Sequence, residues 1–301
     1  MKLQELLRWG NDELKDVQDA EGDARWLLLT AFDMNDSDYL LQKTEEADEE
    51  KQKLFASFIA RRKENEPVAY ILGKWEFMGL DFEVNRNVLI PRQDTETLVE
   101  SALEEALVRL TEEELKDDFR ILDLCTGSGC IAISVGYYLK ENMTLALSGI
   151  RPEIWASDIS TEALTMAKKN ADLSGVEINF RQGDLFDALA GEAKKPMFDM
   201  ILSNPPYIDG PQMKTLPACV RDYEPDLALS GGEDGLWFYR RLAEKAGEYL
   251  KPGGVIFWEI GEEQAEAVSR LICSQPDLRM EEVIKDLAGH DRVIRASRRN
   301  N

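Results

Sequence analysis

An apolar stretch of the chain ends at four residues that cannot extend a strand, because residues 200–208 read MILSNPPYI. Proline has no N–H and a fixed φ, so Pro205 and Pro206 hold this loop stiff and leave backbone carbonyls free to accept hydrogen bonds. The Asn204 side-chain oxygen and the Pro205 carbonyl then form a rigid pair of acceptors for an NH2 group. The Tyr207 ring supplies a wall beside that group.

The chemistry that suits such a pair is attack by a planar amide or aryl amine, whose delocalised lone pair makes it a poor nucleophile. Accepting both hydrogens of the NH2 group favours a geometry that presents the lone pair to an electrophilic carbon. No strong general base is needed before attack, because the nitrogen becomes acidic only as its charge develops. We predict that the catalytic residues are Asn204, Pro205, Pro206 and Tyr207.

A second candidate site is the turn CTGSG at residues 125–129, which directly follows the apolar run RILDL at residues 120–124. Glycine permits tight turning, and the amides at the start of the next helix face whatever binds there. The third glycine of the dinucleotide pattern G-x-G-x-x-G is absent. The spacing fits instead the cofactor loop of S-adenosylmethionine-dependent methyltransferases. The predicted cofactor-binding residues in this turn and in the run before it are Asp123, Cys125, Thr126, Gly127, Ser128 and Gly129.

Cysteine stands at position 125 where the first glycine of that loop is common, which matters only if the turn needs a positive φ there. Carboxylates follow the next two predicted strands. Asp158 is placed to accept hydrogen bonds from two ribose hydroxyls. Asp184 is placed to bind an adenine amine, with Leu185 or Phe186 packing on the ring.

These residues need a scaffold that brings the ends of several strands together, and the second part of the chain predicts one. Apolar runs alternate with helical patterns of 10–15 residues, which is typical of a mostly parallel sheet with helices on both faces. In such α/β sheets, ligands bind at the carboxyl ends of the strands. The seven expected strands are RILDL, IWASD, EINFRQGD, FDMILSN, GGVIFWEIG, LRMEEVI and DRVIRAS.

The first part of the chain differs in pattern and charge. Residues 1–66 carry apolar positions at helical spacing, with 17 acidic against 10 basic residues, and they predict a small helical domain. Because an enzyme that acts on a small molecule would not need this domain, we expect it to dock a protein substrate. Alternation between Trp75 and Val84 around a Met-Gly pair predicts a β-hairpin. Asp94 or Thr95 can cap the helix that follows. The predicted division is a helical domain at 1–66, a hairpin linker at 67–90 and a methyltransferase domain at 91–301.

The composition of the chain limits which binding partners and which kinds of metal site we expect. The 301 residues are 44% hydrophobic and carry a net charge of -22, which would repel a phosphate backbone, so we expect no direct nucleic-acid partner. The acidity serves either solubility or a basic protein partner. A single histidine and four cysteines without C-x-x-C spacing exclude most zinc sites, and we expect no metal. No apolar run could span a bilayer, so we expect a cytoplasmic protein.

Several motifs together resemble one family. SNPPYI resembles the motif of amino methyltransferases that act on adenine, cytosine or glutamine amide nitrogens. PVAYILGKWEF, VLIPRQDTETLVE, LDLCTGSGCIAIS, EPDLALSGGEDGLWFYRRL and IFWEIGEEQ are similar, in the same order, to segments of the peptide chain release factor glutamine methyltransferases, the HemK or PrmC family. The resemblance covers nearly everything from Pro67 to Arg295.

This resemblance implies a class I methyltransferase domain of Rossmann-like fold that uses S-adenosyl-L-methionine and releases S-adenosyl-L-homocysteine. The implied substrate is the glutamine of the Gly-Gly-Gln loop in bacterial class I release factors. Carried over by position, residues 126–129, Asp158 and Asn204 would contact the cofactor, and residues 204–207 would hold the glutamine amide. The family often has tryptophan where Leu185 stands, so stacking on the adenine is not assigned to a ring here.

For two segments of the chain, the sequence is compatible with two different roles. Pro91, Arg92 and Glu96 lie in a family motif near the expected cofactor site, or simply join the hairpin to the next helix. The segment EPDLALSGGEDG at residues 224–235 forms a lid over the reacting groups or a long connection. His290 is expected to be a turn residue rather than a catalyst.

Two other functions are compatible with parts of the sequence. A nucleic-acid amino methyltransferase shares NPPY and the chemistry, but it predicts a basic cleft and aromatic residues for base flipping, where this chain has an acidic helical segment. A non-enzymatic binding protein would not need Asn204 in register with a cofactor loop.

Overall fold

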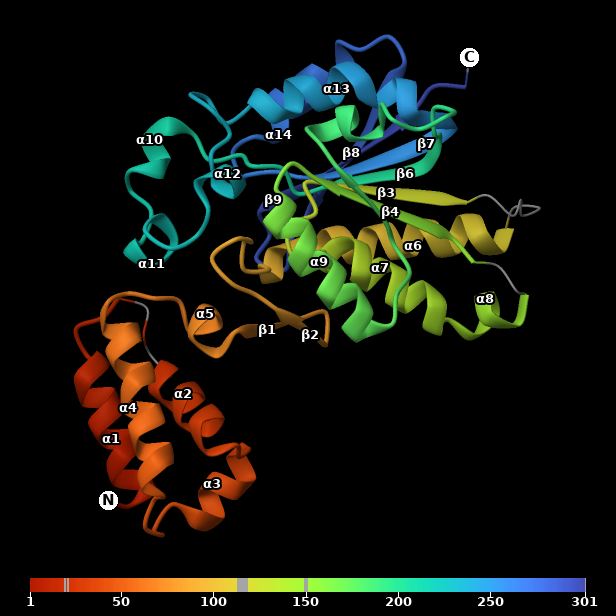
Figure 1. Ribbon diagram of the computed structural model, residues 1–301. Helices are drawn as coiled ribbons and strands as arrows, with labels where there is room; N and C mark the ends of the chain where they lie inside the picture. The colour runs from red at the N-terminus through yellow and green to blue at the C-terminus, as the bar shows by residue number, and fades with distance from the viewer. Residues whose placement is uncertain (19, 21, 113–118, 149–150, 301) are drawn as a thin grey trace. The chain divides into compact units, whose positions relative to one another are not determined.

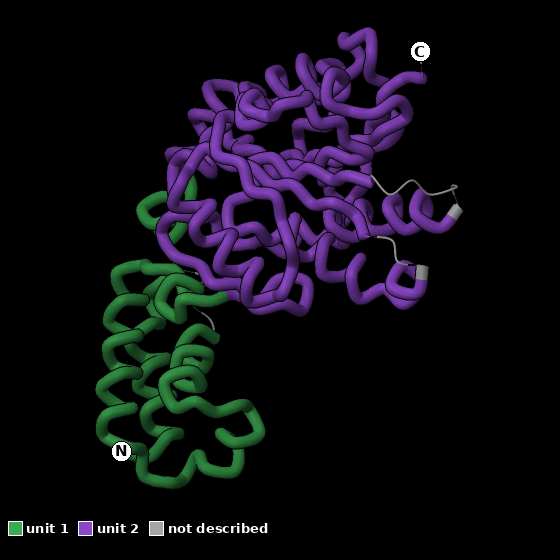
Figure 2. The backbone as a smooth tube through the Cα atoms, turned by 45° about the vertical axis from the view of Figure 1, so that its right-hand side comes forward, with its two compact units in different colours: residues 1–74, 216–224 green, residues 75–215, 225–301 purple. Residues whose placement is uncertain are grey.

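The computed structural model of the chain describes residues 1–18, 20, 22–112, 119–148 and 151–300. It divides into two compact units, which Figure 2 colours separately. The first unit comprises residues 1–74 and 216–224, and the second comprises residues 75–215 and 225–301.

The first unit is a helical bundle whose apolar residues recur at helical spacing. Gly10 allows its helices to approach closely, because a Cβ at this position would lie 2.7 Å from the Phe55 ring. Asn35 and Asp48 cap two of the helices through their side-chain oxygens. The described helices of this unit are α1 (Leu3–Leu14), α2 (Asp23–Phe32), α3 (Asp36–Gln42), α4 (Glu49–Lys63), α5 (Val68–Leu72) and α11 (Ala218–Arg221).

A hairpin of β1 (Lys74–Phe77) and β2 (Leu80–Glu83) precedes the main sheet. Met78 and Gly79 turn it with φ of 51° and 68°. A short 3-10 turn, η1 (Gln93–Thr95), then leads into the long helix α6 (Glu96–Glu112). Glu96 Oε1 accepts a hydrogen bond from the Met78 N–H at 2.9 Å, so the side chain at the start of α6 fixes the hairpin turn.

The second unit is built on a seven-stranded sheet in the order β5-β4-β3-β6-β7-β9-β8. The first five strands in this order pair in parallel, and β9 pairs antiparallel with both of its neighbours. The predicted α/β fold with a mostly parallel seven-stranded sheet is confirmed. The strands are β3 (Arg120–Leu124), β4 (Glu153–Asp158), β5 (Asn179–Gln182), β6 (Phe198–Ser203), β7 (Leu250–Glu259), β8 (Leu278–Lys285) and β9 (Asp291–Arg298).

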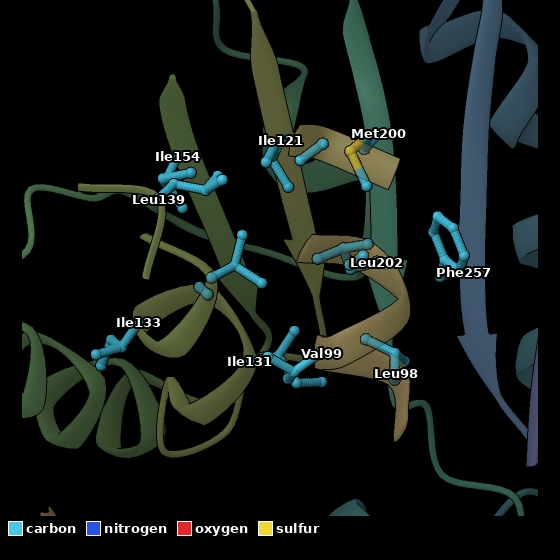
Figure 3. Close-up of a cluster of buried hydrophobic side chains, with 14 of the residues drawn as sticks. Leu98, Val99, Ile121, Ile131, Ile133, Leu139, Ile154, Met200, Leu202 and Phe257 are labelled. Atoms are coloured by element: carbon cyan, nitrogen blue, oxygen red, sulfur yellow. The ribbon is translucent and has the colours of Figure 1, made fainter. Parts of the chain in front are cut away.

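Helices cover both faces of this sheet (Figure 1). Successive strand residues point to opposite faces, so Leu202 and Phe257 pack toward α6 and α7 (Figure 3), while Ile201 and Trp258 pack toward α13 and α14. The longer helices of this unit, besides α6, are α7 (Cys130–Glu141), α9 (Thr161–Ser174), α13 (Trp237–Tyr249) and α14 (Ala265–Cys273). Shorter helical turns are α8 (Met143–Ser148), η2 (Leu185–Leu189), α10 (Gly210–Met213) and α12 (Asp226–Leu229).

Within the described part of the chain, no helix combines the length and the apolar character needed to cross a membrane.

Candidate active site

A pocket opens at the carboxyl ends of β3, β4, β5 and β6, where parallel strands bring their following loops together. Seven of the residues predicted from the sequence lie in its wall. They are Cys125, Gly127, Asp158, Asp184, Leu185, Asn204 and Pro206.

The backbone of the turn after β3 adopts left-handed conformations. Cys125 has a φ of 60° and Gly127 a φ of 56°. A Cβ at Gly127 would meet no described heavy atom within 4 Å, so the space over this residue is open to a ligand. The positive φ explains why glycine suits position 125, and it makes Cys125 a strained residue at the pocket.

Gly129 also has a role in helix packing, which the sequence did not indicate. It has a φ of 85° at the start of α7, and a Cβ there would lie 2.7 Å from Ile133 Cδ1 and 3.1 Å from Ala167 Cβ. The glycine therefore allows α7 and α9 to pack closely. The predicted residues Asp123, Thr126 and Ser128 are buried and do not line the pocket.

Asp158 ties the turn to the end of β4. Its Oδ2 accepts a hydrogen bond from the Gly127 N–H and its Oδ1 accepts one from the Ser160 N–H, both at 2.9 Å. Burial raises the pKa of this carboxyl, and these two backbone donors oppose the rise. A carboxylate has further lone pairs, so Asp158 can still accept from hydroxyls in the pocket.

Asp123 is fully buried beneath the turn. Its Oδ2 accepts a hydrogen bond from the Thr126 hydroxyl at 2.6 Å, and Oδ1 has no hydrogen-bond partner among the described residues. The pKa of Asp123 is raised to about 7, mainly by burial and to a smaller extent by the nearby Asp158 carboxylate, while the hydrogen bond from Thr126 opposes the rise. With none of its surface exposed, Asp123 supports the turn from within and does not line the pocket.

Asp184 follows β5 and is paired with a cation that the sequence did not reveal. Arg241 of α13 donates to both of its carboxylate oxygens, at 3.0 and 2.8 Å. Leu185 lies in the pocket wall with a φ of 50°, while Phe186 stacks on Tyr249 with 4.7 Å between ring centroids. Of the two side chains considered for packing on an adenine, Leu185 faces the pocket.

The NPPY loop follows β6 at the same edge of the sheet. Asn204 Nδ2 donates to Thr95 Oγ1 at 3.1 Å, and Asn204 and Pro206 lie in the pocket wall. The Tyr207 hydroxyl lies 3.4 Å from Glu259 Oε1, and burial raises the pKa of this phenol. Pro205 is buried.

The segment of residues 224–235 packs against the backbone of this loop. A Cβ at Gly231 would lie 2.7 Å from Tyr207 Cα, and a Cβ at Gly235 would collide with the Tyr207 carbonyl oxygen. Gln264 Nε2 donates to the same carbonyl at 2.9 Å. Three residues of the segment, Pro225, Leu227 and Ala228, also lie in the pocket wall.

Sequence reasoning did not identify three polar residues around the site. Thr95 contacts Asn204, whereas the sequence suggested it only as a helix cap. Glu259 ends β7 next to Tyr207, and a charged residue directly after the apolar run VIFW was the signal available. Asn170 of α9 donates to the Glu83 and Ser128 carbonyls, so it joins the hairpin to the cofactor turn.

Other residues singled out from the sequence lie elsewhere. His290 lies in the turn between β8 and β9, with its Nδ1 3.1 Å from Glu262 Oε2, and more than half of its side chain is exposed. Glu96 joins the hairpin to α6, in agreement with the simpler of its two readings.

Comparisons with known proteins identify relatives over nearly the whole chain. The family model of the PrmC N-terminal domain matches residues 5–73, and that of the methyltransferase small domain matches residues 104–221. The chain is 38% identical to the release factor glutamine methyltransferase of Clostridium acetobutylicum over 99% of this chain and 96% of that protein. It is 37% identical to the Bacillus subtilis protein of the same name, over 96% of each chain.

Among solved structures, the protein-(glutamine-N5) methyltransferase (release factor-specific) from Alicyclobacillus acidocaldarius is 30% identical, with 72% of this chain and 99% of that chain covered and a TM-score of 0.39. The matched methyltransferase model and the strand order of the sheet agree on a class I methyltransferase fold.

Proposed function

The chain belongs to the family of release factor glutamine methyltransferases, and from that premise we propose that it methylates the glutamine of the Gly-Gly-Gln motif in bacterial class I release factors. The methyl donor is S-adenosyl-L-methionine, and the acceptor is the side-chain amide nitrogen.

One observation carries this proposal. Asn204 and Pro206 of the NPPY loop line the same pocket as Gly127 of the cofactor turn and Asp158 at the end of β4. An amide held by the loop is therefore next to a nucleoside held by the turn. A binding protein without catalysis would have no need for this juxtaposition.

The residues of the pocket fit the donor in distinct ways. Asp158 would accept from the ribose hydroxyls, Leu185 would pack on the adenine, and the open space over Gly127 would admit the amino acid portion. When bound, S-adenosyl-L-methionine supplies a methyl group on a sulfonium. Asp123 and Thr126 would support the turn from beneath rather than touch the nucleoside, because both are buried behind the wall.

The loop acts on the substrate amide by hydrogen bonding alone. The Asn204 Oδ1 and the Pro205 carbonyl would accept the two amide hydrogens, and the Tyr207 ring would confine the amide plane. Transfer of the methyl group to the nitrogen would break its bond to the sulfonium sulfur and would leave S-adenosyl-L-homocysteine. The nitrogen then loses one proton to solvent, so no strong base is needed in the wall.

A transfer assay tests the proposal directly. The chain is incubated with labelled S-adenosyl-L-methionine and either a class I release factor, the same factor with its Gly-Gly-Gln glutamine replaced by alanine, or DNA. We expect label on the intact factor only. Label on DNA, or equal label on the alanine variant, would instead favour the nucleic-acid amino methyltransferase or another acceptor. The net charge of -22 already disfavours a nucleic-acid substrate.

We also propose that the first unit binds the release factor. Its helix α3 leaves Leu41 80% exposed, so this apolar side chain is available for contact with a partner. Leu41→Asp should raise KM for the intact factor and leave KM for a short Gly-Gly-Gln peptide unchanged. Met143→Asp, at a similarly exposed apolar residue of α8, is the matched control and should change neither. Equal KM values for Leu41→Asp and the unsubstituted chain would contradict this role.

A further inference from the structure

Helix α9 presents one face to several parts of the cofactor site. Ala163, Ala167 and Asn170 recur at helical spacing, so they lie on the same side of the helix. Ala163 lines the pocket, and a Cβ at Gly129 would lie 3.1 Å from Ala167 Cβ. Asn170, one turn further on, is completely buried. This face of α9 therefore extends from the pocket wall to the backbone of the cofactor turn.

The carboxamide of Asn170 joins two segments that are far apart in the sequence. Its Oδ1 accepts a hydrogen bond from the Glu83 N–H at 2.8 Å, and its Nδ2 donates to the Glu83 carbonyl at 3.0 Å. The same Nδ2 donates to the Ser128 carbonyl at 2.9 Å. The side chain thus pairs with the end of β2 as a neighbouring strand would, and it also holds the cofactor turn. Because the acceptor and both donor hydrogens are engaged, the amide is fixed in its orientation.

The loop that leaves β2 at Glu83 forms part of the pocket. Residues 87–89 of this loop line the same pocket as Gly127 and Asp158. Asn170 therefore sets the position of the loop relative to the cofactor turn, since it holds the last residue of β2 and a residue of the turn together. A ligand that contacts both parts of the wall binds best when their separation is fixed in advance.

We propose that Asn170 is a positioning residue for the cofactor: it holds residues 84–90 against the cofactor turn and thereby raises the affinity for S-adenosyl-L-methionine. The inference rests on the methyl donor proposed above. Asn170 does not line the pocket, so its effect passes through Glu83 and Ser128. A wall that is already ordered lowers the entropic cost of binding. The loss of Asn170 should therefore be measured in cofactor binding rather than in the methyl transfer step.

A second contact between α9 and Glu83 provides a contrast within the same pair of segments. Lys169 pairs with the Glu83 carboxylate, but 58% of the lysine side chain and 34% of the glutamate side chain are exposed. Exposed ion pairs contribute little to stability, because water and salt screen them. Removal of this ion pair should leave the loop in place, whereas removal of the buried amide should release it.

Isothermal titration calorimetry of the full chain with S-adenosyl-L-methionine and with S-adenosyl-L-homocysteine tests the proposal. We expect Asn170→Ala to raise both Kd values by about 10-fold or more, the lower end of the range seen when a residue that orients a binding group is lost. At saturating cofactor, kcat and the KM for a release factor should stay within about threefold, because the NPPY loop is not held by Asn170. Lys169→Ala is the matched control, and its Kd values should stay within about twofold of those of the unsubstituted chain.

A core variant and hydrogen exchange separate positioning from general destabilisation. Val176→Ala opens a cavity just beyond the end of α9, so it should lower the urea midpoint without changing Kd. In the unsubstituted chain, the amides of residues 84–90 should exchange more slowly once the cofactor is bound. Asn170→Ala should speed exchange at these residues, and neither Lys169→Ala nor Val176→Ala should do so.

The possible results distinguish this inference from the proposed function. If the unsubstituted chain binds S-adenosyl-L-methionine and Asn170→Ala binds it equally well, the inference fails and the proposed function stands. Should Asn170→Ala not fold, exchange in the unsubstituted chain decides, because a lack of protection at residues 84–90 on cofactor binding overturns the inference. An unsubstituted chain that does not bind S-adenosyl-L-methionine defeats the proposed function itself.

Discussion

The carboxylate of Asp158 accepts a hydrogen bond from the backbone N–H of Gly127, with 2.9 Å between Oδ2 and the nitrogen. The bond joins the end of β4 to the turn after β3, and both residues lie in the pocket wall. One carboxylate therefore shapes the cofactor turn and also lies within reach of a nucleoside bound in it.

Replacing Asp158 by alanine should weaken cofactor binding. Hydrogen bonds to charged groups contribute about 1.5–3 kcal/mol, so Kd for S-adenosyl-L-methionine should rise by about 10- to 100-fold in isothermal titration calorimetry. Asp187→Ala is the control, since this exposed carboxylate pairs with Lys245 outside the pocket wall. If the Kd of Asp158→Ala stays within about twofold of the Kd of Asp187→Ala, the ribose hydroxyls do not hydrogen bond to the Asp158 carboxylate.

Replacing Asn204 by alanine should affect turnover far more than binding. The variant loses an acceptor for the substrate amide, and we expect kcat to fall by about 100-fold or more. Kd for the cofactor should change by less than about tenfold, because other wall residues remain. Single-turnover kinetics with saturating cofactor measure the fall in turnover. An unchanged kcat contradicts the role given to this side chain.

The positive φ of Cys125 predicts an order of stability between two variants. Cys125→Gly and Cys125→Ala lose the same thiol, but only glycine relieves the left-handed strain, with φ at 60°. The glycine variant should therefore have the larger free energy of unfolding, by about 1 kcal/mol in urea denaturation. Equal urea midpoints for Cys125→Gly and Cys125→Ala would show that the left-handed conformation at position 125 is not strained.

The packing of Gly235 against the NPPY loop predicts a loss of both stability and activity. In Gly235→Ala the new Cβ would lie 2.6 Å from Gln264 Nε2 and would also press on the Tyr207 carbonyl. We expect a loss of about 2–4 kcal/mol in unfolding free energy and at least about tenfold in kcat, because the loop must shift.

Gly289→Ala is the matched control for Gly235→Ala. Gly289 has a φ of 88°, and its Cβ would meet no described atom within 4 Å, so only the backbone penalty applies. It should lose about 1 kcal/mol of stability without any change in kcat. Similar kcat values for the two alanine variants would show that the loop tolerates movement.

The buried Asp123 predicts how stability depends on pH. Because burial raises its pKa to about 7 in the folded chain, the folded state holds a proton that the unfolded state has released between about pH 4 and pH 7. The contribution of Asp123 is therefore fully present below pH 4 and is lost as pH rises through 7. Asp123→Asn removes this dependence, so its advantage in urea midpoint over the unsubstituted chain should grow from pH 5 to pH 7. If the urea midpoints of Asp123→Asn and of the unsubstituted chain change in parallel with pH, the raised pKa of Asp123 is contradicted.

Most of the fold could be predicted from local pattern. The apolar runs RILDL and FDMILSN are set by residues adjacent in sequence, and their bounds agree with β3 and β6 to within a residue. The positions of Asn204 and Asp158 in the pocket follow from the same rule, since strand ends meet at one edge of a parallel sheet.

The partners of these residues could not be predicted, because they depend on contacts across long stretches of sequence. Thr95 precedes Asn204 by 109 residues, and Arg241 lies 57 residues from Asp184. A helix-capping role for Thr95 satisfies local rules equally well. Likewise the spacing of CTGSG cannot distinguish Gly127, which faces the pocket, from Gly129, which separates two helices.

The membership of Leu216–Glu224 in the first unit has a practical consequence. Both flanks of this segment belong to the second unit, and the Tyr223 hydroxyl donates to the Glu64 carbonyl at 2.6 Å. The first unit is thus encoded in two separate stretches of the gene. A fragment that stops at residue 74 lacks the part of the first unit that residues 216–224 form. A fragment that starts at residue 75 keeps residues 216–224 without the rest of that unit. Excising or swapping this unit between relatives requires exchanging both stretches together.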